Sequence, residues 1–152
     1  MLDPHALHEQ FHLALTGTHP DASATYRSAL AAVTMLVGDD EIEGRSAWLD
    51  YGHVGTGASA RESEIAVHLR VLTRSGIIRL DQDFDFNGAP DAHLIPWSQV
   101  IRLHVIAKNE SAEPTPVNVW VETSTAGRVE FHGTPVPRAL TAIIESVRRN
   151  TR

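Results

Sequence analysis

The chain has 152 residues, of which 42% are hydrophobic and 21% charged, and this size and composition are typical of one soluble globular domain. It contains no cysteine, which excludes disulfides, thiolate nucleophiles and zinc sites with sulfur ligands. Its formal net charge of -6 repels phosphate polymers and anionic lipid, so the composition argues against nucleic acid and membrane surfaces as partners.

The start of the chain does not have the pattern of a targeting segment. Residues 1–10 carry no lysine or arginine and no apolar run follows them, so a secretory signal is not expected. The longest apolar-rich stretch, residues 29–37, is far shorter than the roughly 18 residues that span a bilayer. The sequence therefore predicts a soluble cytoplasmic protein without a transmembrane segment.

Two helices are predicted in residues 1–38. The first covers residues 3–17, which begin with an Asp-Pro pair and end at a glycine. The second covers residues 21–37 and ends at Gly38. Its apolar residues recur at helical spacing, at Tyr26, Leu30, Val33 and Val37. We expect a helical hairpin that extends the main domain, and because its apolar stripe must be buried, we expect homo-oligomerisation through residues 3–37.

Beyond residue 39 the hydrophobic period changes from nearly four to two, which is typical of β-strands. A strand is predicted around residues 47–51, followed by a glycine-rich loop over residues 52–60. In the next run the apolar residues Ile65, Val67, Leu69 and Val71 are expected to face the core, and His68 and Arg70 to face solvent. A hairpin follows, in which Gly76 is expected to supply a positive φ.

The remaining strands are predicted between residues 95 and 131. Ile95-Pro96-Trp97 is expected to open a strand that continues through residues 101–107, because proline is tolerated at a strand's first residues. After a loop over residues 108–116, Val121 should pair with Val129. This register also sets Glu122 opposite Arg128, an attractive pair, whereas a slip of two residues would oppose two glutamates.

A C-terminal helix is predicted to begin near Pro137. Its apolar residues fall on one stripe, at Val136, Leu140, Ile143, Ile144 and Val147. Such a one-sided helix must cover an apolar surface, for which a curved sheet is suited. The sequence therefore predicts an α+β protein in which residues 39–152 form an antiparallel meander of six or seven strands, as a barrel or half-barrel, capped by a helix.

Four segments in this order resemble the bacterial type of pleckstrin-homology-like (PH-like) domain over roughly residues 40–150. They read VHLRVLTRSGIIRLD, HLIPWSQVIRLHV, VNVWVETSTAGRVEFHG and ALTAIIESVRR. The resemblance implies a curved barrel of seven strands with a C-terminal capping helix. Membrane-directed members of that family have a basic loop after the first strand, whereas this loop sets Arg61 against Glu62 and Glu64. Phosphoinositide binding is therefore disfavoured.

A metal-dependent hydrolase is one alternative function. His8-Glu9-Gln10-Phe11-His12 matches H-E-x-x-H, in which two imidazoles one helical turn apart bind zinc and the glutamate activates water. His5, His8 and His12 would share one edge of the first helix, so the same residues are also consistent with a histidine-rich edge beside an apolar stripe.

Two further motifs compete with less specific interpretations. Residues 83–91 imitate the start of an EF-hand loop, but position twelve is Leu94 instead of the bidentate glutamate that calcium requires. Residues 64–80 resemble the recognition helix and following strand of a winged-helix DNA-binding protein, with Ser59 and Glu62 as a capping box, although strand alternation explains their apolar residues better.

Trp120 is the best candidate for a partner-binding residue. Alternation with Val119 and Val121 places its indole on the polar face of its strand, and exposed tryptophan beside arginine is enriched at the centres of protein interfaces. The other candidates share that polar face: Arg102, His104, Arg128 and His132. The N-terminal hairpin could instead cover this face. We expect a non-enzymatic module that binds a protein partner or itself, and no residue is assigned to catalysis, metal or cofactor.

Overall fold

The computed structural model describes residues 6–7, 24–54, 56–59, 61–83, 90–107, 117–132 and 138–152. In chain order its elements are α2 (Ala24–Val37), β1 (Ile42–Val54), η1 (Gly57–Ser59), β2 (Arg61–Thr73), β3 (Gly76–Asp83), β4 (Ala92–Pro96), η2 (Trp97–Gln99), β5 (Val100–Ala107), β6 (Val117–Thr123), β7 (Gly127–Phe131) and α3 (Arg138–Asn150). Of the helix expected over residues 3–17, only Ala6 and Leu7 are described, and both are helical. The rest of that helix lies outside the described residues.

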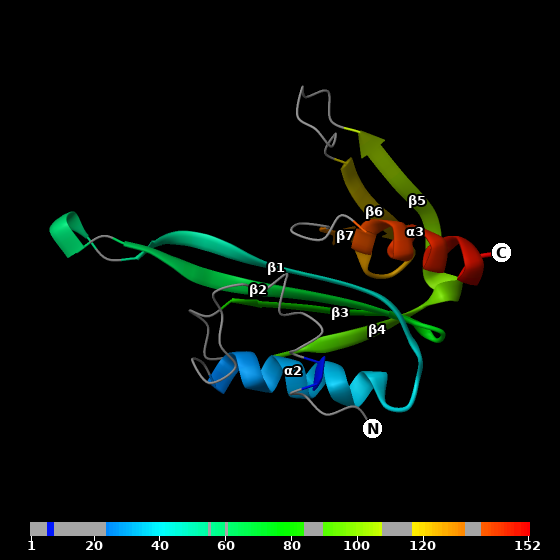
Figure 1. Ribbon diagram of the computed structural model, residues 1–152, viewed down its shortest axis with the longest axis horizontal. Coiled ribbons are helices and arrows are strands. Elements are labelled where there is room, and N and C mark those ends of the chain that lie inside the picture. Colours follow the sequence, from blue (N-terminus) through cyan, green and yellow to red (C-terminus); the bar gives the residue numbers. More distant parts are fainter. Residues whose placement is uncertain are drawn as a thin grey trace.

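In the described part of the chain, seven strands form two antiparallel sheets, one with the order β1-β2-β3-β4 and one with the order β5-β6-β7. Figure 1 shows α2 on the side of the larger sheet that faces away from the smaller sheet and α3. The predicted α+β class and strand number are confirmed. The predicted barrel is not closed, because among the described residues no strand of one sheet pairs with a strand of the other.

The apolar stripe of α2 is buried within the chain. Leu30, Val33 and Val37 are at most 3% exposed and share a core with Leu69 and Leu80 of the larger sheet. The sheet thus covers the stripe of α2 that was expected to need a second copy, so this stripe gives no reason for self-association. Gly38 ends α2 as expected, with a φ of 55° that glycine adopts without strain.

The segment with winged-helix resemblance forms a strand. Residues 61–73 belong to β2, which contradicts the alternative of a recognition helix there. The loop expected over residues 52–60 is shorter than predicted, because β1 continues to Val54 and β2 starts at Arg61. Figure 1 shows these two strands extending beyond β3 and β4 to η1.

A second core lies between the two sheets and α3. One row across the larger sheet, formed by Gly44, Leu72, Ile77 and Ile95, turns toward this core. A Cβ atom at Gly44 would lie 3.4 Å from Cγ1 of Ile143, so α3 packs closely on β1. Leu140, Ile143 and Val147 are buried there, which confirms the predicted helix stripe.

Two local predictions around β4 are wrong. Gly76 is not among the glycines with positive φ; instead, a Cβ atom there would lie 2.2 Å from the carbonyl oxygen of Ile95, so the close approach of β4 requires glycine. Ile95-Pro96-Trp97 does not open a strand. Pro96 ends β4, and Trp97 begins η2, where its buried indole Nε1 donates to the Thr73 carbonyl oxygen at 2.9 Å.

The register predicted for the last hairpin is confirmed. Val121 pairs with Val129 and Glu122 with Arg128, so the apolar residues of β6 and β7 face α3. The polar residues of these strands therefore lie on the opposite, outer face of the smaller sheet.

Candidate functional site

The outer face of the smaller sheet gathers the five residues predicted to bind a partner. Directly paired residues lie on the same face, and the pairing produces one row of Arg102, Glu122 and Arg128 and a second row of His104, Trp120 and Glu130. His132 follows Glu130 two residues along the chain. We call this surface the Trp120 face, and neither α2 nor α3 covers it.

Trp120 is half-buried between two polar side chains on this face. The His104 ring stacks on the indole with centroids 4.9 Å apart, and the Arg128 guanidinium carbon lies 4.0 Å from the ring centroid. Each neighbour is held by a carboxylate: His104 Nε2 lies 2.9 Å from Glu122 Oε1, and Arg128 Nε lies 3.1 Å from Glu130 Oε1. The indole therefore has a cation-π contact with Arg128 on one side and a stacked imidazole on the other.

A second aromatic cluster lies where β7 meets the larger sheet. Two imidazole rings stack on the Trp48 indole, that of His132 with ring centroids 3.8 Å apart and that of His68 with ring centroids 4.8 Å apart. The Arg70 guanidinium carbon is also 4.8 Å from the Trp48 ring centroid. We call Trp48, Asp50, His68, Arg70, Asp81 and His132 the junction cluster. Of these, the sequence had indicated only His132 as a site residue.

Arg70 is buried, which corrects the expectation that it faces solvent. Its side chain is 3% exposed, and Nη1 donates to the carbonyl oxygens of Leu69 and Leu80, both at 3.0 Å. Nε donates to the Glu130 carbonyl oxygen at 3.1 Å, and Nη2 contacts Asp81 Oδ1 at 2.8 Å. One guanidinium thus joins β2, β3 and β7.

Side chains of the larger sheet also form hydrogen bonds with the edge of β7 that faces away from β6. Ser46 Oγ donates to the His132 carbonyl oxygen at 2.6 Å and accepts from the His132 amide at 2.7 Å. Arg79 Nη1 donates to the Ala126 carbonyl oxygen at 3.1 Å. These contacts satisfy backbone groups that a neighbouring strand would pair in a closed barrel.

His68 lies between two carboxylates. Nδ1 is 2.6 Å from Asp81 Oδ1 and Nε2 is 2.7 Å from Asp50 Oδ2, so only the doubly protonated ring can donate to both. Burial opposes the charged form, but the hydrogen bonds to Asp81 and Asp50 outweigh it and raise the pKa of His68.

Asp81 is the charge that balances the cations of the junction cluster. Burial by itself would raise its pKa, but hydrogen bonds from His68, Arg70 and Arg79 hold the pKa of this carboxyl well below its usual range. At His132 burial dominates and lowers the pKa, and the nearby charges of His68 and Arg70 act in the same direction. His68 is therefore the more basic of the two imidazoles that stack on Trp48.

The Trp120 face and the junction cluster are continuous. A hollow of about 440 Å³ is lined by the junction cluster together with Arg79, Arg128 and Glu130. A hollow of about 220 Å³ lies beside Trp120 and shares Arg128, Glu130 and His132 with it. Two tryptophans thus lie along one polar surface that crosses from the larger to the smaller sheet.

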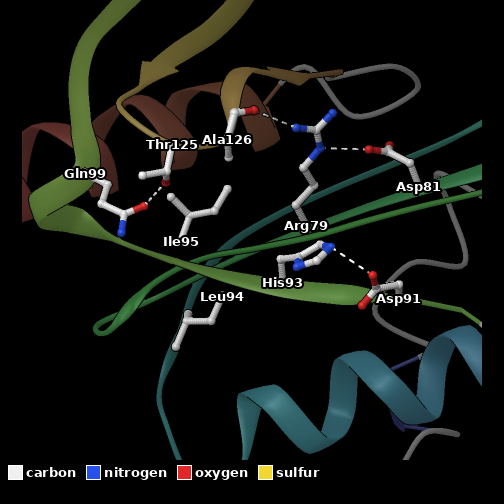
Figure 2. A pocket seen from close by; sticks show the side chains of 9 residues that line it. All are labelled: Arg79, Asp81, Asp91, His93, Leu94, Ile95, Gln99, Thr125 and Ala126. Atoms are coloured by element: carbon white, nitrogen blue, oxygen red, sulfur yellow. Dashed lines mark hydrogen bonds and ion pairs between the residues drawn. The ribbon is translucent and has the colours of Figure 1, made fainter.

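A third hollow, of about 640 Å³, lies between β4 and the β6–β7 turn (Figure 2). Arg79 extends toward Asp81 and Ala126, and its Nε contacts Asp81 Oδ2 at 2.7 Å. His93 lies beside it and contacts Asp91 at 3.2 Å, and Gln99 accepts a hydrogen bond from Thr125. Because Arg79 and Asp81 line both this hollow and the junction hollow, the two are neighbours.

The metal-binding alternatives lie largely outside the part of the chain that the structure describes. His5, His8 and His12, and most of the acidic segment between Asp83 and Asp91, are not described. Within the described ranges, no group of three or more acidic or histidine side chains is placed to hold a metal ion. None of the described helices has the length and apolar character that crossing a membrane requires.

The chain matches no protein-family model, no curated protein and no solved structure.

Proposed function

We propose that this chain is a non-enzymatic interaction module that binds a protein partner through the Trp120 face. The observation that supports it most directly is the placement of Trp120, which is half-buried and stacked between His104 and Arg128 on a sheet face that α2 and α3 leave free. Tryptophan and arginine are the residues whose truncation most often costs binding energy at protein interfaces.

The surrounding chemistry favours a protein over a phosphate-rich ligand. Three arginines of this surface are already paired with carboxylates: Arg128 with Glu130, and Arg70 and Arg79 with Asp81. A surface with alternating charges around tryptophan complements a mixed-charge protein surface, whereas a phosphate cluster requires unpaired cations.

We further propose that residues 39–152 form a PH-like domain, as the sequence resemblance implies. The order of elements supports this assignment: a four-stranded antiparallel meander, a three-stranded meander and a C-terminal helix packed on the core between them. The missing backbone pairing between the sheets departs from the closed barrel that the resemblance implies.

The test is affinity capture with the full chain from the source cell, followed by measurement of affinity for the captured protein. We expect Trp120→Ala and Arg128→Ala each to weaken binding by about tenfold or more, since such interface residues typically contribute at least about 2 kcal/mol. Met35→Ala is the matched control, because Met35 is 67% exposed on α2, away from this face. Equal binding by all three variants, with unchanged circular dichroism, would contradict the proposal.

A further inference from the structure

The outer edge of β5 is unpaired in the described structure. β5 is the first strand of the smaller sheet and pairs only with β6, and Figure 1 shows it on the outside of that sheet. The opposite edge strand, β7, is covered by Ser46, Arg70 and Arg79, but no comparable set of side-chain contacts is found at β5 among the described residues. An edge strand presents a row of backbone donors and acceptors that can pair with another chain.

Among the described residues, three of the seven exposed large apolar side chains lie on β5 and a fourth lies on β6. Ile101, Val105 and Ile106 of β5 are 64%, 48% and 50% exposed, and Val117 on the neighbouring β6 is 37% exposed. Natural proteins protect a long edge strand with lysine, proline or charges that point inward. The described β5 contains one charged side chain, Arg102, and no proline. An apolar edge of this kind is typical of a strand that pairs with another chain.

We propose that β5 pairs antiparallel with β5 of a second copy of this chain, about a two-fold axis at His104. A symmetric contact requires a surface that complements itself, and the regular part of β5, Arg102–Ile106, meets this condition. Paired about His104, Leu103 lies opposite Val105 of the second copy on the inner face. On the outer face Arg102 lies opposite Ile106 of the second copy, where its aliphatic stem can cover the isoleucine.

The neighbouring register is less favourable. An axis at Leu103 would set Arg102 opposite His104 of the second copy and would require Ile101, which lies in the irregularity between Val100 and Arg102, to pair. The axis at His104 avoids both. Each His104 ring is held over its own sheet by Trp120 and Glu122, so the two rings do not compete for the space between the strands.

This dimer would be a six-stranded sheet with both Trp120 faces on the same side, because the two-fold axis runs perpendicular to the sheet. The inference does not depend on the proposed function. It concerns the edge of β5, whereas the proposed partner binds the outer face.

Disulfide cross-linking tests the register directly, since the chain contains no cysteine of its own. Opposite residues in an antiparallel pair have Cβ atoms about 4.5–5.5 Å apart, close to disulfide reach. We expect His104→Cys to cross-link readily and Met35→Cys, an exposed control on α2, to form no intermolecular disulfide. A mixture of Arg102→Cys and Ile106→Cys should cross-link between the two variants faster than either variant alone. Equal rates for His104→Cys and Met35→Cys would overturn the proposal.

Sedimentation equilibrium on the unmodified chain provides the second test. We expect a dimer that Val105→Lys and Ile106→Lys each weaken by about tenfold or more, and that Met35→Lys leaves intact. Both residues are half exposed, so neither change should disturb the fold, which circular dichroism checks. A monomer at every soluble concentration, or a dimer that neither lysine variant weakens, would overturn the proposal.

Discussion

His68 is the residue whose protonation most directly affects the junction between the sheets. Both of its ring nitrogens are within 2.7 Å of a carboxylate oxygen, and the same Asp81 oxygen that contacts His68 also contacts Arg70. Loss of the proton would leave one carboxylate facing a ring nitrogen with no hydrogen to donate. The charge on His68 is therefore part of the network that holds Arg70 in place.

We expect His68 to stabilise the fold at low pH and to lose this effect as the pH rises. Its pKa is raised above the ordinary value of 6.5, so its contribution is complete below 6.5 and disappears as the pH passes through the folded-state pKa. NMR titration of the His68 ring measures that pKa. The free energy of unfolding of the wild type and of His68→Gln should converge as the pH rises.

His132 provides the contrast for this measurement. Burial lowers its pKa, so the folded protein resists its protonation, and stability should fall as the pH drops below the ordinary 6.5. His132→Gln should remove that loss, while His68→Gln should not. A His68 ring that titrates below 6.5 would contradict the interpretation of this site.

The difference between Trp120 and Arg70 shows how much of the site the sequence predicts. Strand alternation places each of these side chains on the face of its strand that its apolar chain neighbours do not occupy. The pairing within the two sheets confirms this placement. The expected solvent exposure of Arg70 is nevertheless wrong, because β7 covers it through a contact with Glu130, 60 positions away in the sequence. A period of two predicts the face of a residue, but the covering of that face depends on contacts between distant segments.

At the scale of elements, the accuracy of prediction depends on whether local chemistry decides the outcome. The register of β6 and β7 was predictable because Glu122 and Arg128 oppose each other across a short turn. The end of β4 at Pro96 was not, since η2 is anchored by the Trp97 indole bonding to Thr73 on another strand. The requirement for glycine at position 76 is similar. It arises from the close approach of the Ile95 carbonyl oxygen of β4, which the sequence of the turn at Gly76 does not indicate.

Arg70 joins three strands, so its removal should weaken their packing together. Arg70→Met keeps most of the apolar stem but leaves the Glu130 carbonyl and Asp81 without this donor. The ion pair is only partly buried, since the Asp81 side chain is 33% exposed, and Asp81 keeps His68 and Arg79 as partners. Removal of a buried donor from such acceptors costs about 1–3 kcal/mol, the loss that we expect in urea unfolding. Arg74→Met is the matched control, because the ion pair between Arg74 and Glu41 is exposed and should change stability by less than about 1 kcal/mol. Similar losses in both variants would contradict the assigned role of Arg70.

At the scale of the whole molecule, the larger sheet separates two cores. α2 covers one face of that sheet, and α3 with the smaller sheet covers the other. Hydrophobic periodicity predicted the number of strands and the final helix, but the relation between the sheets depends on Ser46, Arg70 and Arg79 meeting the edge of β7. The residues that make these polar contacts do not recur at a regular spacing. Hydrophobic periodicity therefore could not predict that side chains, and not strand pairing, join the two sheets.

Ser46→Ala tests whether side chains, in place of strand pairing, hold β7 on the larger sheet. The Ser46 hydroxyl is buried and binds both the amide and the carbonyl of His132, 86 positions away, so its removal leaves two backbone groups unpaired. We expect a loss of about 1–3 kcal/mol in the free energy of unfolding. In hydrogen exchange the His132 amide should lose protection, while amides at the centre of β2 keep theirs. Ser98→Ala, at an exposed position in η2, is the control and should leave both unchanged. If the His132 amide stays protected in Ser46→Ala, contacts other than the Ser46 hydroxyl hold the edge of β7 on the larger sheet.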